Sequence, residues 1–458
     1  MKIGCRAAAG VAVTVSLVAG QALASAGLAA RADAIAAASG VSWGKATQVP
    51  GLRVLNTGNF AQVTSMSCTA SGNCAAGGFY RDRSRHNQAF VVSRKNGSWG
   101  QASRVSGPVL SGSRYSALTT VSCARRGYCA AGGIYQDPSR NSQAFVVSEK
   151  AGIWGRAMEV PGTAALNTFG IAEVSSVSCA SPGNCTAGGH YSIGLDPLGN
   201  PIFQGFVVTE KNGSWGKAAA VHDASADSSV TSVSCASPGN CSAGTADGFL
   251  LNEKGGAWGK AVKVGWAVAS VSCASAGNCT AAGGMVISEV NGTWGTATVI
   301  PGLAALGSGE ILSLSCASPD NCSAGGVYQF TANSRSYDEA FVVSEVSGAW
   351  GTARKVPGTA SLNTGGEASV NSVSCASPGN CAAGGFYTDR RNNQQAFVVR
   401  QAGGSWRNAL EVPGTAVLNT GGDAQVFSVS CAKAGLCSGG GWYKHGGASW
   451  QAFVVSET

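Results

Sequence analysis

A cysteine hairpin motif recurs eight times along this chain, and it limits the possible folds more than any other feature. In every copy the two cysteines lie six positions apart; the copies are SMSCTASGNC, TVSCARRGYC, SVSCASPGNC (three times), SVSCASAGNC, SLSCASPDNC and SVSCAKAGLC. Trp-led segments alternate with the motif and begin at Trp43, Trp99, Trp154, Trp215, Trp258, Trp294, Trp350 and Trp406. Self-similarity at roughly 50 residues predicts stacked supersecondary units.

Each repeat contains four runs typical of β-strands. In the last repeat they are WRNALEV, VFSVSC, CSGGGWY and QAFVVSE, and in other copies ASPGN supplies turn residues between the cysteines. The run AFVV is apolar at consecutive positions, so we expect both its faces to be buried between neighbouring sheets. Four short antiparallel strands per repeat predict a β-propeller, because a β-helix uses shorter repeats and one such unit is too small to fold alone.

The two ends of the repeat region predict how the ring closes. The region opens on a lone Trp segment, WGKATQV, and ends on AFVVSET. If the Trp strand is outermost in each blade, the first one completes the last blade and removes an exposed sheet edge. We predict an all-β, eight-bladed propeller of four-stranded antiparallel blades over residues 41–458, or seven blades if two short units merge.

The N-terminus is typical of an export signal. Lys2 and Arg6 precede a short apolar stretch, and Ala24–Ala26 offers a small-residue cleavage site, which predicts a signal peptide over 1–26 and an Ala-rich linker over 27–40. No later window reaches the about 18 apolar residues of a membrane span. The sequence therefore predicts a secreted, extracellular protein.

Sixteen of the 17 cysteines belong to the hairpins, and Cys5 falls in the predicted signal peptide. An even, regularly paired set in an exported chain predicts disulfides, whereas zinc usually needs closer ligands and a second pair. Each bridge would close a loop of about seven residues and contribute about 2 kcal/mol. The expected pairs are Cys68/Cys74, Cys123/Cys129, Cys179/Cys185, Cys235/Cys241, Cys273/Cys279, Cys316/Cys322, Cys375/Cys381 and Cys431/Cys437.

Charge and composition exclude some classes of partner. The formal net charge is +8, or +6 without Lys2 and Arg6, and only 12% of residues are charged. Without a basic stripe, the chain does not resemble a nucleic-acid-binding protein. A surface of Ser, Asn, Thr, Gly and Gln suits a soluble extracellular protein, which we expect to be monomeric. No EF-hand or His-rich pattern occurs, so no metal or cofactor is predicted, although loop aspartates leave Ca²⁺ open.

These units resemble the SVSC-type repeat of secreted bacterial proteins, in which a Trp-led strand precedes SVSC-x-S-x-x-x-C and a Gly-rich turn. The resemblance covers residues 43–458 and implies a propeller fold and an exported location, but no reaction. The Gly-Ser-Trp and Gly-Thr-Trp turns are distantly similar to the Asp-box of sialidase-like propellers. Here the box aspartate is absent, with Lys95 or Lys211 near its place, so sialidase chemistry is not implied.

The long, variable connections are the predicted binding face, because function on rigid scaffolds concentrates in such loops. They include LNTGN, LNTFG and LNTGG before the innermost strand, and YRDRSRHNQ, YQDPSRNSQ and YTDRRNNQQ between the second and third strands. The opposite face is expected to hold only tight cysteine hairpins and Gly-Trp turns. Aromatic rings and arginines in the long loops suit sugar stacking and bidentate contacts with anionic groups. The predicted ligand-contacting residues are Tyr80, Arg81, Arg83, Tyr135, Tyr191, Tyr328, Arg335, Tyr387, Arg390, Arg391, Trp442 and Tyr443.

Each of these features also has a structural interpretation. The tyrosines recur after a Gly pair in six repeats, so repetition alone could place them in blade packing. The loop arginines are offset by Asp82, Asp137, Asp196, Asp338, Glu339 and Asp389, as expected of solvated loop charge. The tryptophans of the Trp-led segments match the blade period and are predicted to be structural.

An enzyme is the remaining alternative. Glycosidases need two carboxylates about 5–9 Å apart. Glu173, Glu310, Glu367 and Asp423 lie where the long loop enters the innermost strand, and Glu367 and Asp423 fall at equivalent positions of neighbouring repeats. Repeat equivalence explains this coincidence without chemistry, so the pair is a weak catalytic candidate. The four histidines are scattered.

The sequence thus predicts a secreted binding or scaffold module, with carbohydrate or cell-envelope polymer as the leading ligand class. A protein-interaction platform is the first alternative, because a propeller fold does not fix function. A glycoside hydrolase or related carbohydrate-active enzyme is the second.

Overall fold

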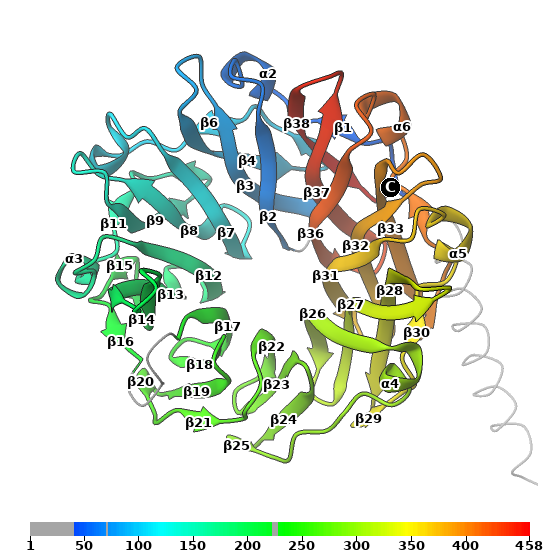
Figure 1. The fold of residues 1–458 in the computed structure, drawn as a ribbon. Coiled ribbons are helices and arrows are strands. Elements are labelled where there is room, and N and C mark those ends of the chain that lie inside the picture. The colour runs from blue at the N-terminus through cyan, green and yellow to red at the C-terminus, as the bar shows by residue number, and fades with distance from the viewer. Residues whose placement is uncertain (1–40, 70–71, 222–227) are drawn as a thin grey trace, which may run out of the picture. The chain divides into compact units, whose positions relative to one another are not determined.

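The computed structural model describes residues 41–69, 72–221 and 228–458, so the predicted signal peptide and linker lie outside the described residues. Trp43–Thr458 form one compact unit. Within it, eight antiparallel sheets are arranged around a central axis as the blades of an eight-bladed β-propeller (Figure 1). The predicted fold is confirmed, and the two shortest repeats form separate blades rather than merging.

The SVSC segment forms the innermost strand of each blade, and these strands surround the axis in Figure 1. Blades 1 to 8 are numbered in the order of these strands. They are β2 (Ala61–Thr69), β7 (Ser116–Arg125), β12 (Ala172–Ser181), β17 (Val230–Ser237), β22 (Val268–Ser275), β26 (Ser308–Ser318), β31 (Ala368–Ser377) and β36 (Ala424–Lys433).

The second strand of each blade carries the second cysteine, which lies opposite the first cysteine across the hairpin, with Cα atoms 3.9–4.0 Å apart. All eight predicted disulfides are therefore formed. The second strands are β3 (Asn73–Arg81), β8 (Tyr128–Gln136), β13 (Asn184–Leu195), β18 (Asn240–Thr245), β23 (Asn278–Gly283), β27 (Asn321–Ala332), β32 (Asn380–Thr388) and β37 (Leu436–His445).

The AFVV run lies in the third strand, and both its faces are buried, as its unbroken apolar pattern predicts. In blade 7, Phe397 and Val399 join the core shared with blade 6, whereas Ala396 and Val398 join the core shared with blade 8. The third strands are β4 (Asn87–Lys95), β9 (Ser142–Lys150), β14 (Pro201–Lys211), β19 (Phe249–Lys254), β24 (Val286–Val290), β28 (Arg335–Val346), β33 (Gln394–Ala402) and β38 (Ser449–Ser456).

The Trp-led segment is outermost, but it forms two short pieces where the sequence predicted one strand. In blade 1, β5 and β6 both pair with β4, and the residue after the Trp, Gly100, donates its N–H to Ser93 O (2.9 Å) before the chain leaves the ladder. The Trp pieces are β5 (Ser98–Trp99), β10 (Ile153–Trp154), β15 (Ser214–Trp215), β20 (Ala257–Trp258), β25 (Thr293–Trp294), β29 (Ala349–Trp350) and β34 (Ser405–Trp406). The second pieces are β6 (Ser103–Arg104), β11 (Met158–Glu159), β16 (Ala219–Ala220), β21 (Val262–Lys263), β30 (Arg354–Lys355) and β35 (Leu410–Glu411).

The ring closes as the chain ends predict. Strand β1 (Thr47–Gln48) pairs with β38 in blade 8, and Trp43 forms an isolated bridge with Glu457. A side-chain hydrogen bond from Gln48 Nε2 to Gln451 Oε1 (2.8 Å) supports the same pairing. Blade 8 is thus built from both ends of the repeat region.

Single helical turns, which the sequence did not reveal, follow the outermost strand in six repeats. Each starts just after a glycine, and several begin at the Pro-Gly of motifs such as VPGTAVLNT. They are α2 (Leu52–Leu55), the 3₁₀ turn η2 (Pro108–Leu110), α3 (Thr163–Leu166), α4 (Leu303–Leu306), α5 (Thr359–Leu362) and α6 (Thr415–Leu418). Among the described residues, no helix is long and apolar enough to cross a membrane.

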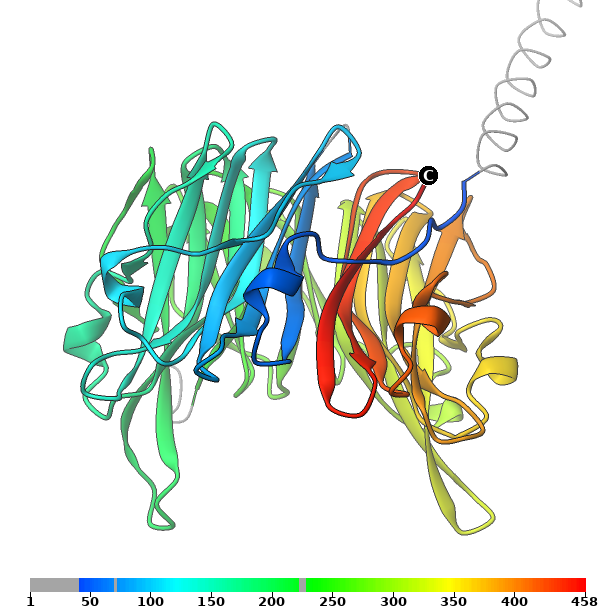
Figure 2. The ribbon, with the colours of Figure 1, turned by 90° about the horizontal axis from the view of Figure 1, so that it is seen from above.

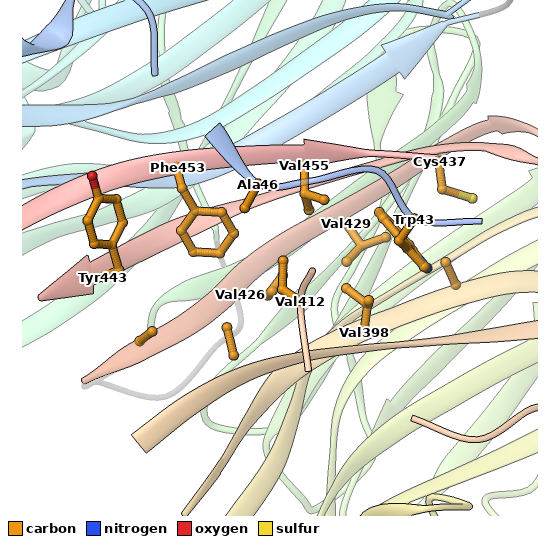
Figure 3. Close-up of a cluster of buried hydrophobic side chains, with 13 residues drawn as sticks. Trp43, Ala46, Val398, Val412, Val426, Val429, Cys437, Tyr443, Phe453 and Val455 are labelled. Atoms are coloured by element: carbon orange, nitrogen blue, oxygen red, sulfur yellow. The ribbon is translucent and has the colours of Figure 1, made fainter. Parts of the chain in front are cut away.

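The hydrophobic core lies in the seams between neighbouring blades. Figure 3 shows the seam between blades 7 and 8, where Val398 and Val412 face Val426, Phe453 and Val455. Trp43 completes this cluster and is 8% exposed. Because each blade buries two faces in this way, no blade has a core of its own.

Serine hydroxyls connect the innermost strands around the ring. In the seam between blades 1 and 2, Cys123 N–H donates to Ser67 Oγ (2.9 Å), and in the closing seam Cys68 N–H donates to Ser430 Oγ (2.8 Å). The first serine of the motif, or Thr120 in blade 2, accepts a second N–H in each of the eight seams. The motif serines are therefore explained by contacts between blades.

The two ends of the blades form two different faces, seen edge-on in Figure 2. We call the end with the cysteine hairpins and Gly-Trp turns the disulfide face, and the end with the long connections the loop face. Two hairpins, β13–β14 in blade 3 and β27–β28 in blade 6, extend furthest on the loop face (Figure 2). The second strands of blades 4 and 5 between them have only six residues each.

Candidate functional site

The six tyrosines predicted to contact a ligand lie at the loop-face end of the second strands, but they are buried. Their exposed fractions are only 3–5%, because each side chain turns into the core of a seam. No ring face is therefore available for a sugar to stack on, which corrects the predicted role of these residues. They are Tyr80, Tyr135, Tyr191, Tyr328, Tyr387 and Tyr443.

The tyrosine hydroxyls are held by polar partners at the edge of the core. Tyr135 donates to Glu159 Oε2 (2.8 Å), and Tyr387 donates to Glu411 Oε2 (3.2 Å). Burial, reinforced by the neighbouring carboxylates, raises the pKa of both phenols. These rings pack the blades together and remain protonated, as the structural interpretation of their repetition expects.

The half-exposed position on the loop face is the residue before each tyrosine, and it is aromatic in only some of the blades. Successive residues of a strand point to opposite faces of the sheet, so a shift of one residue exchanges the buried for the accessible set. Side chains at this position differ from blade to blade, unlike the tyrosines. They are Phe79, Ile134, His190, Val327, Phe386 and Trp442.

The seam between blades 8 and 1 gathers an aromatic cluster beside this position. Phe60 lies 5.7 Å from Phe79 and 5.5 Å from Trp450 between ring centroids. Arg81 lies over Phe60 (5.1 Å), and Lys444 lies over Trp450 (5.0 Å). All three rings are half-buried. Arg81 was predicted from the sequence, whereas Phe60, Phe79 and Trp450 were not, because Phe60 and Trp450 are not repeated and Phe79 recurs only as Phe386 of blade 7.

Aspartates of the long loops point back into their own turns. Asp389 Oδ1 accepts the N–H groups of Arg391 (2.8 Å) and Asn393 (3.0 Å), and Oδ2 accepts Gln395 Nε2 (3.2 Å). Asp82 and Asp137 have the same arrangement in blades 1 and 2. Turn hydrogen bonds therefore occupy these carboxylates and fix the hairpins.

The network continues across the seam into the LNT loops. Asn419 Nδ2 donates to Gln395 Oε1 (2.9 Å), and Asn419 Oδ1 accepts Asp423 N–H (2.8 Å) at the entrance of β36. Asn167 repeats this arrangement with Gln143. The recurring asparagine and glutamine of the motifs thus hold the loop face in place through contacts within the protein.

The predicted arginines lie at the tips of these fixed turns. Arg83, Arg390 and Arg391 are exposed, and Arg335 is exposed at the tip of the β27–β28 hairpin. Arg81 is only half-exposed, since its guanidinium covers Phe60 and donates to Asn87 Oδ1 (3.3 Å). Trp442 is half-buried on the face of blade 8 that meets blade 1.

The four candidate carboxylates occupy two different positions in the blade. Glu173 lies within the innermost strand of blade 3, opposite His190, and Glu310 lies within that of blade 6, opposite Val327. Blades 3 and 6 are not neighbours. Glu367 and Asp423 immediately precede β31 and β36 in neighbouring blades.

Their environments also differ. Burial raises the pKa of Glu173 and Asp423, and for Asp423 the nearby Lys444 opposes the shift. Glu310 and Glu367 are exposed. A catalytic role for Glu367 and Asp423 stays a prediction.

The histidines do not form a cluster. His190 is half-buried against Phe203 (ring centroids 4.6 Å), and desolvation lowers its pKa to about 4. His86 and His445 lie in loop-face turns, and His222 falls outside the described residues. In the part of the chain that the structure describes, no three His, Cys, Asp or Glu side chains come together as a metal site.

The two cysteines of each disulfide differ in burial. The first cysteine is half-buried, as expected of a tight surface turn, whereas the second is buried, with exposed fractions of 3–6%. The buried cysteines are Cys74, Cys129, Cys185, Cys241, Cys279, Cys322, Cys381 and Cys437.

This burial arises because the second cysteine faces the preceding blade. Cys74 Sγ lies 3.6 Å from Ser438 Oγ, Cys241 Sγ lies 3.4 Å from Thr186 Oγ1, and Cys279 Sγ lies 3.2 Å from Ser242 Oγ. In blade 8 the Cys437 N–H donates to Glu457 Oε2 (3.0 Å). The bridges therefore belong to the packing of the seams, and the spacing of the cysteines gave no signal of this, because burial depends on the neighbouring blade.

Cavities lie between blades on the disulfide face, where the sequence predicted only tight turns. One cavity of about 350 Å³ between blades 2 and 3 is lined by Glu149 and Glu210. Another of about 480 Å³ between blades 3 and 4 is lined by Glu210 and Glu253. The repeated Glu two residues before an Ala-Gly, Asn-Gly or Gly-Gly turn was the available signal for these sites.

No protein-family model matches this chain, and a search of the curated proteins finds no match. Solved structures with similarity include Sqt1 from Chaetomium thermophilum (12% identity, 88% of this chain and 97% of that one, TM-score 0.49). YCF48 from Cyanidioschyzon merolae has 12% identity over 74% of this chain and 96% of its own, with a TM-score of 0.41. A Hadza microbial sialidase, Hz136, has 9% identity over 90% and 68%, with a TM-score of 0.38. At such low similarity these proteins give no information on ligand or activity.

Proposed function

We propose that this propeller is an extracellular binding module whose loop face, over blades 7, 8, 1 and 2, binds an anionic polymer, with an acidic carbohydrate as the leading class. The main support is that turn hydrogen bonds hold the loop aspartates while the arginines of the same turns project outward. Arginine recognises carboxylate and phosphate groups through paired, planar hydrogen bonds.

Charge is unevenly distributed around the loop face. The hairpins between second and third strands in blades 7, 8, 1 and 2 hold seven Arg or Lys residues and three Asp residues. The corresponding hairpins of blades 3 to 6 hold one Arg and four acidic residues. The basic set is Arg81, Arg83, Arg85, Arg140, Arg390, Arg391 and Lys444. The acidic set of the other half is Asp196, Asp247, Asp338 and Glu339, of which Glu339 is buried and paired with Lys355. An anionic chain would be attracted to one half and repelled by the other.

The aromatic cluster between blades 8 and 1 supports a carbohydrate over an inorganic anion. Phe60 and Trp450 present partly exposed rings beside Arg81 and Lys444. A uronic-acid unit has an apolar ring face and a carboxylate, and both could be satisfied at this place. Trp442, on the same face of blade 8, extends the aromatic surface.

The test is binding of polygalacturonate to the oxidised chain, with dextran as the uncharged control polymer. We expect saturable binding of polygalacturonate that weakens with salt, because exposed charges are screened. Arg390→Ala/Arg391→Ala should weaken binding about tenfold or more, equivalent to about 1.4 kcal/mol. Lys150→Ala/Lys211→Ala, which removes two exposed charges from the disulfide face, is the matched control and should have no effect. Equal binding of dextran, or equal losses in both variants, would overturn the proposal.

A protein partner is the second candidate, supported by blade 3. The tip of the β13–β14 hairpin exposes Leu198 (87%) and Leu195 (55%), and Phe169 is 52% exposed in the adjoining LNT loop. Exposed apolar side chains grouped on a projecting hairpin are typical of protein contacts. Leu195→Ser/Leu198→Ser should leave polygalacturonate binding unchanged, so this variant separates the two candidates.

A further inference from the structure

A buried carboxylate recurs on the disulfide face at one position of the third strand. It lies opposite the Trp of the outermost strand, as Glu210 does with Trp215 and Glu253 with Trp258. Blade 1 has Arg94 and blade 7 has Gln401 at this position, and both are buried. The carboxylates are Glu149, Glu210, Glu253, Glu289, Glu345 and Glu457, with exposed fractions of 1–5%.

The cavity between blades 3 and 4 differs from an ordinary packing defect, because the carboxylate of Glu253 lines it. Glu210 also borders it, but its Oε1 accepts the Ser148 hydroxyl of blade 2 (2.7 Å), so that carboxylate belongs to the seam between blades 2 and 3. The cavity volume of about 480 Å³ falls in the range of small-ligand sites, which is about 300–1,000 Å³. Glu253 is 2% exposed; its Oε1 accepts Thr209 Oγ1 (3.3 Å), whereas its Oε2 is buried without a hydrogen-bond partner in the protein. A buried, unpaired carboxylate oxygen is costly and calls for a donor.

Glu345 and Glu457 also leave one buried oxygen without a hydrogen-bond partner, whereas Glu289 receives compensation that Glu253 lacks. Glu289 accepts Asn252 Nδ2 (2.5 Å) and Ser242 Oγ (3.4 Å), and the charge of Lys254 opposes the effect of burial on its pKa. For Glu253, burial raises the pKa and only the Thr209 hydrogen bond opposes it. Lys211, one blade before Lys254, lines the cavity but is exposed and forms no ion pair among the described residues.

Access to the cavity is open on the disulfide face. Gly255 and Gly256 form part of its lining, and an added Cβ at either would meet nothing within 4 Å. Thr186 and Thr209 line the interior beside Glu253. The site therefore combines the Glu253 carboxylate with two hydroxyls, and its glycine lining leaves open space beside it.

We propose that this cavity is a binding site for an organic cation, namely a guanidinium or primary ammonium group. The unpartnered Glu253 Oε2 and the hydroxyls of Thr186 and Thr209 match the several N–H donors of such a group. A metal ion would need more oxygen ligands, and among the described residues no three His, Cys, Asp or Glu side chains gather here. The site lies on the face opposite the proposed polymer surface, so the two proposals stand or fall separately.

The experiment titrates the oxidised full propeller with Nα-acetyl-arginine methylamide and, in parallel, with agmatine. Nα-acetyl-citrulline methylamide, which has the same shape without the charge, is the control probe. Binding is followed by NMR of threonine methyl groups, because Thr186 and Thr209 report directly from the cavity. We expect these two signals to shift with either cationic probe, at a Kd of about 1 mM or below, and not with the citrulline probe. Tighter binding of the arginine probe would indicate that the natural ligand is a peptide side chain. Tighter binding of agmatine would indicate that it is a free amine.

Two variants complete the test. Glu253→Gln should weaken binding about tenfold or more, whereas Glu289→Gln, at the equivalent position of blade 5, should not change it. Retained affinity in Glu253→Gln, or equal binding of the citrulline probe, would overturn the proposal. If Glu253→Gln does not fold, the native protein decides: unshifted Thr186 and Thr209 signals at about 10 mM arginine probe would overturn it equally.

Discussion

The disulfide face and the loop face are built from the same eight repeats, but the repeats are nearly alike at the disulfide face and differ in sequence and length at the loop face. On the disulfide face, every blade has a Cys-Cys bridge and a Trp that pairs with the same position at the end of the third strand. That position is residue 94, 149, 210, 253, 289, 345, 401 or 457. On the loop face, the hairpin between second and third strands ranges from the Gly-Met turn of blade 5 to the long β27–β28 arms of blade 6.

The reason for the difference lies in what each end contacts. Near the disulfide face, the motif serines bond to the next blade, so a change in one blade disturbs two seams. The long hairpins of blades 3 and 6 extend beyond the other blades in Figure 2, and the bridges that join third strands to a neighbouring blade, such as Ser142 to Ile171 and Asp338 to Glu367, lie near the hairpin bases. Strict repetition therefore marks contacts between blades, and variation marks the surface free to diverge.

Removing one disulfide should give the largest effect and would test whether the repeated face carries the stability. For Cys375→Ala/Cys381→Ala we expect a loss of about 2 kcal/mol, because a loop of about seven residues is no longer closed in the unfolded chain. Urea unfolding of the oxidised variant measures it. The comparison variant deletes Thr331, Ala332, Arg335 and Ser336, which shortens the β27–β28 hairpin by two pairs and keeps its turn. We expect less than about 0.5 kcal/mol there; similar losses in both would break the contrast between the faces.

Stability should fall as pH rises, because of the buried carboxylates on the disulfide face. Desolvation and nearby Asp320 raise the pKa of Glu345 to about 7. The pKa of this carboxyl is higher in the folded protein than in the unfolded chain. Its contribution to stability is therefore complete at a pH below the pKa of the unfolded state, and it is lost as the pH rises through the pKa of the folded state. Between pH 5 and pH 8 we expect a loss on the order of 1–2 kcal/mol from this residue.

Thermal unfolding across that range measures the loss, and Glu345→Gln should flatten the profile. Glu310→Gln, an exposed carboxylate at the loop-face end of the same blade, is the control and should leave the profile as it is. A native protein whose melting temperature rises from pH 5 to pH 8 would contradict the prediction.

A smaller effect is expected from the serine contacts that join the innermost strands. Ser176 Oγ accepts the N–H of Val233 from the next blade (2.9 Å). Ser176→Ala should cost about 1 kcal/mol, because that N–H loses its acceptor in a buried seam. Ser176→Thr should be nearly neutral, since Thr120 accepts the same bond in blade 2. If both variants unfold at the same denaturant concentration as the native chain, the hydroxyl ladder is not a source of stability.

Much of the fold was predictable because the repeat encodes it. Blade number, closure by the N-terminal strand and all eight disulfides follow from the spacing of Trp and Cys residues. The split outermost strand and the one-turn helices were not predictable, because they depend on where a short segment leaves its ladder. Local propensity carries little information over two to four residues.

The candidate site was predicted less well, for two physical reasons. Tyr387 and its counterparts were chosen for being repeated, yet repetition indicates contacts between blades, and the accessible position is Phe386, one residue earlier. Phe60 and Trp450 belong to different ends of the chain, and only ring closure brings their rings to 5.5 Å. The burial of Glu253 likewise depends on blade 3, which no local pattern describes.

Blade 8 also sets the order in which this molecule can be completed. Strand β1 leaves the ribosome long before its partner β38, and the Gln48–Gln451 contact spans 403 positions of chain. Seven blades can assemble by adding each to its predecessor, but Trp43 and its strand have no sheet to join until β38 is made. Non-local pairings of this kind form slowly. We therefore expect the last step of folding to be the pairing of the first strand with the last one, and conditions that delay this step to leave the outer edge of blade 8 unpaired.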